Sequence, residues 1–216
     1  MKRIFSIITI TTLFFTQLFS QNNTEAKNLL DSFSKTMKSY TSITANFSFT
    51  LSNKAEKIND SYNGSITLQK NMYKVELMGA VAYCNGKTRW THMLEQGDVN
   101  ITEPDQNSED VLENPQNIFT IYEKDFNYKK QTDIIIEGKS NYLIDLIPTS
   151  DEFSYSKISI AFSKQTKEPL EIKYYGKDGN NYTIKISSFT TNKQYQENYF
   201  VFDKSKFPNA EIIDMR

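Results

Sequence analysis

Apolar and polar residues alternate at a period of two over most of the chain after Thr44, and this pattern limits the fold more than any other feature. Successive side chains of a β-strand point to opposite faces of a sheet, so the pattern predicts strands with one buried face. The alternating apolar residues of the first three runs are Phe47, Phe49, Leu51, Ile66, Leu68, Tyr73, Val75 and Leu77.

The remaining strands are predicted by the same pattern and by the turns between them. They cover residues 80–84, 87–93, 132–137, 142–147, 157–163, 170–175, 182–189 and 199–202. Asn85-Gly86 is a tight hairpin signal because both residues accept positive φ. Strands and helices do not alternate along the chain, so we expect an antiparallel sheet.

Two segments have a helical pattern instead. Residues 23–40 place Leu30, Phe33 and Met37 on one stripe, which predicts an amphipathic helix. Asn114-Pro115 resembles a helix start, and it opens a second helix within a polar insertion at residues 103–125. We expect an α+β, mainly β fold: a curved antiparallel half-barrel of about eleven strands, closed by two or three short helices. An incompletely filled, aromatic-lined interior of this kind suits an apolar ligand.

The N-terminus has the pattern of an export signal. Lys2 and Arg3 precede a short apolar run that ends near Ser20, which is typical of a secretory signal peptide over residues 1–20. An uncleaved anchor is disfavoured because the run is short and carries several hydroxyl groups. We expect residues 21–216 to form a single exported domain.

Composition excludes several classes of function. The chain has one Cys, one His and a net charge of −1, so neither a Cys/His zinc cluster nor a nucleic-acid surface is expected. Cys84 and His92 are interpreted as structural residues. We therefore expect no metal, no cofactor and no catalytic activity, and a small secreted hydrolase is disfavoured.

An ordered set of short motifs resembles the periplasmic outer-membrane lipoprotein carrier family LolA, in the form found in Bacteroidetes-like bacteria. The matching segments are 44–49, 83–90 with its Asn85-Gly86-Lys87 turn, 114–119, 178–189, 200–203, 207–208 and 213–216. The resemblance implies an eleven-stranded half-barrel that shields the lipid of lipoproteins. It also implies a monomer that receives cargo from an inner-membrane lipoprotein-releasing ABC transporter and hands it to an outer-membrane acceptor.

The resemblance and the apolar pattern together give candidate site residues. The lipid cavity is assigned to Phe47, Phe49, Leu51, Ile66, Leu68, Tyr73, Val75, Leu77 and Trp90. The lid is assigned to Val111, Leu112, Ile118, Phe119 and Tyr122, and the latch to Lys70. Lys70 stands where proteobacterial members have a basic residue that holds the lid, and a Lys lacks the forked contacts of Arg.

Sequence does not separate cavity-lining positions from core positions, and other functions stay open. One is a regulatory module, since envelope-stress sensors use the same half-barrel. Another is a relative that transports a different lipid, such as a glycolipid.

Overall fold

All strands of the described chain join one open sheet. The computed structural model describes residues 23–105 and 114–216. Its strands are β1 (Ile43–Asn53), β2 (Ile58–Gln69), β3 (Met72–Leu77), β4 (Ala80–Cys84), β5 (Arg89–Met93), β6 (Asp98–Thr102), β7 (Phe126–Lys130), β8 (Ile134–Ile136), β9 (Lys139–Pro148), β10 (Tyr155–Ser163), β11 (Pro169–Gly176), β12 (Asn181–Thr191) and β13 (Glu211–Asp214). Across the described residues the order is β13-β6-β5-β4-β3-β2-β1-β12-β11-β10-β9-β7, with β8 paired to β9.

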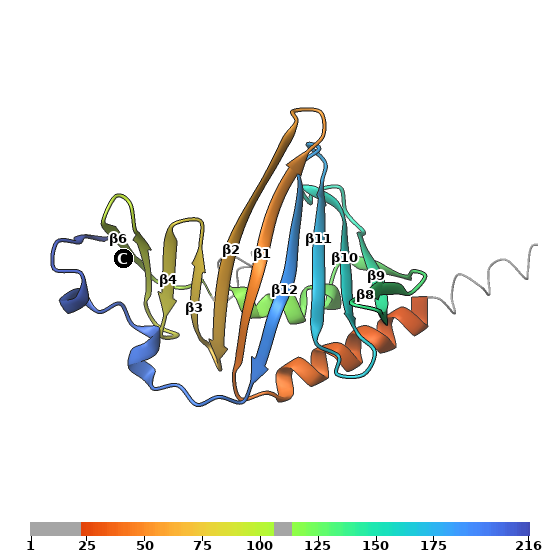
Figure 1. Ribbon diagram of the computed structural model, residues 1–216, viewed down its shortest axis with the longest axis horizontal. Coiled ribbons are helices and arrows are strands. Elements are labelled where there is room, and N and C mark those ends of the chain that lie inside the picture. The colour runs from red at the N-terminus through yellow and green to blue at the C-terminus, as the bar shows by residue number, and fades with distance from the viewer. Residues whose placement is uncertain (1–22, 106–113) are drawn as a thin grey trace, which may run out of the picture.

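The sheet consists of two runs of antiparallel strands joined in the middle. Strands β1 to β6 form one run of hairpins, and β9 to β12 form most of the other. The pairing of β1 with β12 joins them over ten residue pairs. Figure 1 shows that the β1–β2 hairpin projects beyond the neighbouring strands.

One edge of the sheet corrects the expectation of purely antiparallel pairing. Strand β13 pairs parallel with β6, and Ile212 lies opposite Val99. The parallel direction arises because residues 192–210 return across the sheet before the chain reaches β6.

A single amphipathic helix covers one face of the sheet. Residues 23–39 are helical, as predicted. Ala26, Leu30, Phe33 and Met37 lie at helical spacing, and each is at most 2% exposed. The Phe33 ring lies 5.0 Å from that of Phe162 on β10, so the apolar stripe of the helix packs on the second run of strands.

The predicted second helix is present as two short 3-10 helices, η1 (Pro115–Phe119) and η2 (Ile121–Glu123). Pro115 begins the first, where its missing N–H costs nothing. Thr120 separates the two with a φ of −129°, outside helical values. We call residues 114–123 the cover; the pale green coil behind the centre of the sheet in Figure 1 is this segment.

The two faces of the sheet carry different apolar clusters. The inner face, which bears Leu68 and Tyr73, is packed by the helix and the cover. The outer face bears Tyr83 and Trp90 and is packed by Phe202 and other residues of the C-terminal segment. Alternation along β4 explains the division, since Cys84 belongs to the inner cluster and Tyr83 to the outer one.

The C-terminal segment differs from its prediction. Residues 199–202 were expected to form a strand, but Glu197–Phe200 is a 3-10 helix, η3, and Lys204–Lys206 is another, η4. Phe200 is fully buried and packs on the rings of Tyr195 and Tyr199. Aromatic packing on the outer face therefore takes the place of strand pairing here.

The predicted α+β, mainly β fold with a large curved sheet is confirmed. The described residues contain thirteen strands rather than about eleven, because the expectation omitted β6, β7 and β13 and included a strand at 199–202 that is not formed. The predicted signal peptide, residues 1–20, lies outside the described residues. Within those residues, no helix has the length and apolar character needed to cross a bilayer.

Candidate functional site

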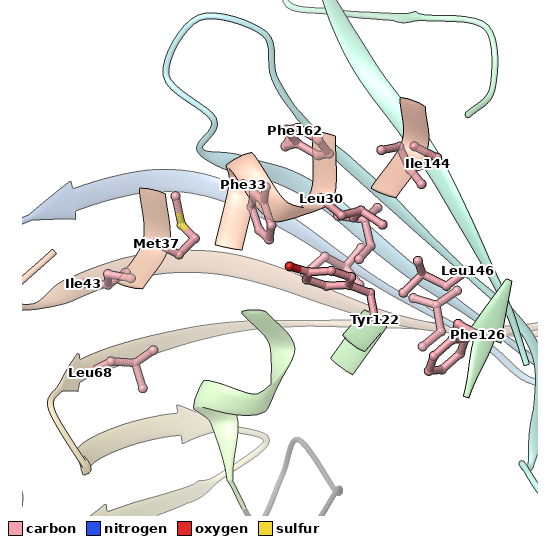
Figure 2. Packing of buried hydrophobic residues seen from close by; sticks show 14 of the residues in the cluster. Leu30, Phe33, Met37, Ile43, Leu68, Tyr122, Phe126, Ile144, Leu146 and Phe162 are labelled. Atoms are coloured by element: carbon pink, nitrogen blue, oxygen red, sulfur yellow. The ribbon is translucent and has the colours of Figure 1, made fainter. Parts of the chain in front are cut away.

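The inner face forms a continuous apolar surface beneath the helix. Figure 2 shows Leu30 and Phe33 of the helix close to Ile144, Leu146 and Phe162 of the sheet. These five side chains are at most 1% exposed. The space under this part of the helix is therefore closely packed.

The cover extends this apolar surface toward the strands of the first run. Ile118, Phe119 and Ile121 are half-buried and pack against the inner cluster. The Phe119 ring meets that of Phe33 edge to face at 6.2 Å. The cover thus buries apolar side chains on the same surface that the helix occupies.

Polar contacts at the margin of the cover hold it to the helix. The Tyr122 hydroxyl donates to Asp31 Oδ1 at 3.1 Å, and Glu123 pairs with Lys38 at 3.1 Å. The Tyr128 hydroxyl donates to the carbonyl of Tyr122 at 2.7 Å, which ties the cover to β7. Asp31, Lys38 and Glu123 are about half exposed, so water can replace their contacts at low cost.

Tyr122 is the buried member of this group, at 3% exposure. Figure 2 shows its ring between the helix and the apolar residues of β7 and β9. Burial raises the pKa of Tyr122 to about 12, while the hydrogen bond with Ser34 lowers it and the Asp31 carboxylate raises it further. The neutral phenol is therefore the form that holds the cover.

A hollow of about 310 Å³ opens at the C-terminal end of the helix, between the cover and the ends of β1 and β2. Its apolar wall contains Met37, Ile43, Leu68 and Phe119. Its polar rim contains Lys38, Tyr40, Thr41, Ser42, Lys70, Asn114, Gln116, Asn117 and Thr120. A polar margin over an apolar wall suits a ligand with an apolar body and a polar end.

The structure places the predicted cavity residues in three groups. Leu68 and Tyr73 are buried in the inner cluster, and Ile66 and Val75 pack against it. Phe47, Phe49, Leu51 and Leu77 share the same strand face by alternation but lie outside that cluster. Phe47 is buried against Gly64, and Phe49 lies beside Tyr182.

Trp90 does not share the face of the other eight cavity residues, which is a correction. It pairs with Tyr83, and both pack in the outer cluster with Phe202. Both faces of β5 carry apolar side chains, so alternation alone did not identify the face on which Trp90 lies.

Two of the predicted lid and latch residues meet at the hollow. Lys70 of the β2–β3 turn and Phe119 of the cover both line it. Val111 and Leu112 of the predicted lid lie outside the described residues. The contact of Asp31 with Tyr122 is not indicated by the sequence, because it joins segments that are far apart in it.

The other residues considered for chemistry occupy structural positions. Cys84 is 1% exposed, and burial raises the pKa of its thiol. His92 is buried in the outer cluster region between aromatic rings. No group of three or more His, Cys, Asp or Glu residues in the described ranges is arranged to hold a metal ion.

Comparison with known sequences identifies a family over most of the chain. The model of the family described as outer membrane lipoprotein carrier protein LolA matches residues 16–177, about three-quarters of the sequence. No curated protein matches the chain significantly.

Several solved structures are similar in fold. An uncharacterized conserved protein from Thermus thermophilus has a TM-score of 0.58 at 12% identity, over 88% of this chain and 99% of that one. LprF from Mycobacterium bovis has a TM-score of 0.50 at 14% identity, over 80% and 95%. A LolA superfamily protein from Nitrosomonas europaea has a TM-score of 0.42 at 12% identity, over 82% and 97%. At such identities the similarity concerns the fold alone.

Proposed function

The chain belongs to the family of outer membrane lipoprotein carrier proteins LolA, and on this premise we propose that it binds the acyl chains of lipoproteins on its inner face and carries them through the periplasm. The cargo comes from an inner-membrane lipoprotein-releasing ABC transporter and passes to an outer-membrane acceptor. Residues 1–20 direct export and are removed, and residues 21–216 act as one domain. No bond is made or broken in this role, so the protein is not an enzyme.

The observation that carries the proposal is the construction of the cover. Its apolar side chains, including Phe119, lie on the inner face, whereas its polar fastenings to Asp31 and Lys38 lie at a solvated margin. Displacing the cover exposes apolar surface while its polar groups regain water. The described arrangement is then the empty state, in which the protein's own side chains occupy the place of the cargo.

The energetics suit reversible transfer. An acyl chain left in water costs about 0.8 kcal/mol per methylene, so even one chain offers enough free energy to displace a half-buried cover. Empty and loaded arrangements must be close in energy if the cargo is to leave for an acceptor. In this proposal the hollow beside Lys70 and Phe119 is where an acyl chain first enters, and Lys70 at its rim contacts the polar end of the cargo.

Locking the cover tests this mechanism. In the variant Lys38→Cys/Glu123→Cys, a short bis-maleimide joins helix and cover where the native side chains meet at 3.1 Å. The exported full chain is incubated with inner-membrane vesicles that carry a triacylated lipoprotein, and bound cargo is identified by native mass spectrometry. We expect the uncrosslinked variant to take up cargo and the crosslinked variant to take up little or none.

The single variants Lys38→Cys and Glu123→Cys, treated with the same reagent, are the matched controls and are expected to retain uptake. A cargo that lacks its acyl chains is expected to stay unbound. Equal uptake with the cover locked and free contradicts a role for the cover. A bound glycolipid without protein favours the alternative of a carrier for another lipid, and a chain that captures no lipid at all contradicts the carrier proposal.

A further inference from the structure

The C-terminal segment crosses the outer face and ends on an edge of the sheet. We call residues 197–216 the strap. Its strand β13 adds four parallel pairs to β6, and all four of its residues are exposed. The flanking backbone bonds run from Glu211 N to the carbonyl of Gly97 at 3.1 Å and from Met215 N to the carbonyl of Ile101 at 2.9 Å. A short, exposed parallel pairing contributes little stability by itself.

Apolar side chains of the strap also pack on the sheet. Phe202 and Phe207 stack on each other with centroids 5.6 Å apart and planes 19° apart. Phe202 and Ala210 are 7% exposed and pack with fully buried Val99 of β6. This small cluster is separate from the inner cluster and packs the part of the strap that leads into β13.

The only histidine of the chain lies against this cluster. His92 on β5 is 3% exposed, and its ring centroid lies 4.5 Å from that of Phe207 and 5.3 Å from that of Phe202. Its Nδ1 atom is buried and has no hydrogen-bond partner among the described residues. Burial lowers the pKa of His92, because no compensating partner stabilises the charged ring.

Several charged residues lie on the strands near His92 and on the strap, but Asp98 and Glu211 lie on the opposite face of the sheet from His92. On β5, β6 and the strap the charged residues are Arg89, Asp98, Glu197, Asp203, Lys204, Lys206, Glu211, Asp214 and Arg216, and Lys74 and Glu76 lie on β3, one strand beyond β4. Asp203 accepts from Ser205 and pairs with Lys206, and Lys204 donates to the carbonyl of Ala210. Lys74 lies over the rings of Tyr83 and Tyr199. Within the described ranges no carboxylate forms an ion pair with His92.

We propose that neutral His92 holds the strap on the outer face and that protonation of His92 releases strand β13 from β6. In a charged imidazolium at this position the Nδ1 proton would be buried beside two phenylalanine rings with neither water nor an acceptor, and separation of the strap gives it access to water. Release uncovers Trp90, Tyr83 and the edge of β6 while the inner face stays packed. This release of β13 on protonation of His92 does not depend on the proposed lipid carriage.

The direction of the pH dependence follows from linkage. A histidine whose pKa is lowered in the closed state destabilises that state as the pH falls below the ordinary value of about 6.5. The open fraction should rise by up to about tenfold per pH unit from there down to the pKa of the closed state. Above about pH 7 the strap should stay closed.

Amide hydrogen exchange measures the opening directly. In the exported full chain we expect exchange at Glu211 and Met215, corrected for intrinsic rates, to rise by up to about tenfold per unit between about pH 6.5 and pH 5. Exchange at Ile158 and Ile160 of β10 should not rise in parallel. The fluorescence of Trp90, the only tryptophan, should shift to longer wavelength over the same range.

His92→Phe keeps an aromatic ring but cannot titrate, so it should remove the pH response. His92→Leu is a second non-titrating variant in case the larger ring fails to fit. Phe207→Ala should open the strap at neutral pH. The same acid response in the wild type and a folded non-titrating variant would overturn the proposal, as would simultaneous exchange of the strap and β10 amides, which would mean global unfolding.

Discussion

The hydroxyl of Tyr122 donates a 3.1 Å hydrogen bond to Asp31, joining the cover to the N-terminal helix across 91 positions of sequence. Tyr122 is buried, whereas the Asp31 side chain is 45% exposed and also pairs with Lys27 at 2.8 Å. The carboxylate therefore stays solvated and partnered when the cover moves. Breaking this contact therefore costs little free energy on the Asp31 side, which suits a segment that must open and close.

Removing the Tyr122 hydroxyl should weaken the cover without disturbing its packing. For Tyr122→Phe we expect a loss of about 1 kcal/mol in the free energy of unfolding by urea, the usual contribution of one such hydrogen bond. Tyr62→Phe on the exposed part of β2 is the matched control and should change little. Equal effects of the two substitutions would show that the bond to Asp31 contributes nothing.

Alkaline pH should act on the same contact. The pKa of Tyr122 is raised to about 12 in the folded protein, so the neutral phenol stabilises the fold fully below about pH 10, the ordinary tyrosine value. That contribution is lost as the pH rises from about 10 to about 12, and it amounts to about 3 kcal/mol. We expect the difference in unfolding free energy between wild type and Tyr122→Phe to fall over this range; a constant difference would contradict the buried position of the phenol.

Truncating the apolar side of the cover should favour its open form. Phe119→Ala removes a half-buried ring that meets Phe33 at 6.2 Å, and we expect a loss of about 2 kcal/mol in unfolding free energy. Binding of a fluorescent fatty acid should become faster because less apolar contact must be broken. Ile135→Ala, at a position 69% exposed on β8, is the control and should alter neither quantity.

Gly64 should resist substitution although it lies within a strand. A Cβ at this position would lie 2.6 Å from Cζ of Phe47 and 2.9 Å from the carbonyl oxygen of Glu76. We expect Gly64→Ala to lower the unfolding free energy by about 2 kcal/mol. Adding Phe47→Leu should recover part of the lost unfolding free energy, because the clash with the ring is removed while the clash with the Glu76 carbonyl oxygen remains. A neutral Gly64→Ala would mean that β2 and β3 separate more readily than their packing indicates.

Local pattern predicted most strands that have one buried face, although β6 with buried Val99 and β7 with buried Phe126 were missed. The helix stripe of Leu30, Phe33 and Met37 was also evident, because 3.6-residue periodicity needs no knowledge of distant partners. The polar first half of β2, residues 58–64, was missed because most of its side chains are exposed and lack alternation. It forms a strand because β1 pairs along its whole length.

The site was harder to predict because its contacts are long-range. Trp90 was assigned to the inner face since nothing in its strand shows that a distant segment, through Phe202, covers the other side. The sequence did not indicate the contact of Asp31 with the cover, because a carboxylate on the polar side of a helix is usually solvated. Lys70 and Phe119 were named separately, and only the fold shows that they border one hollow.

The parallel pairing of β6 with β13 also has a kinetic consequence. The two strands are separated by more than half the length of the chain, so the ribosome makes one long before the other. During that interval the aromatic side chains of β4 and β5 on the outer face have no packing partner. A chain that folded before the strap was made would expose these side chains and could aggregate through them. We therefore expect biogenesis of this protein to depend on chaperones that keep the polypeptide unfolded until the strap has been synthesised.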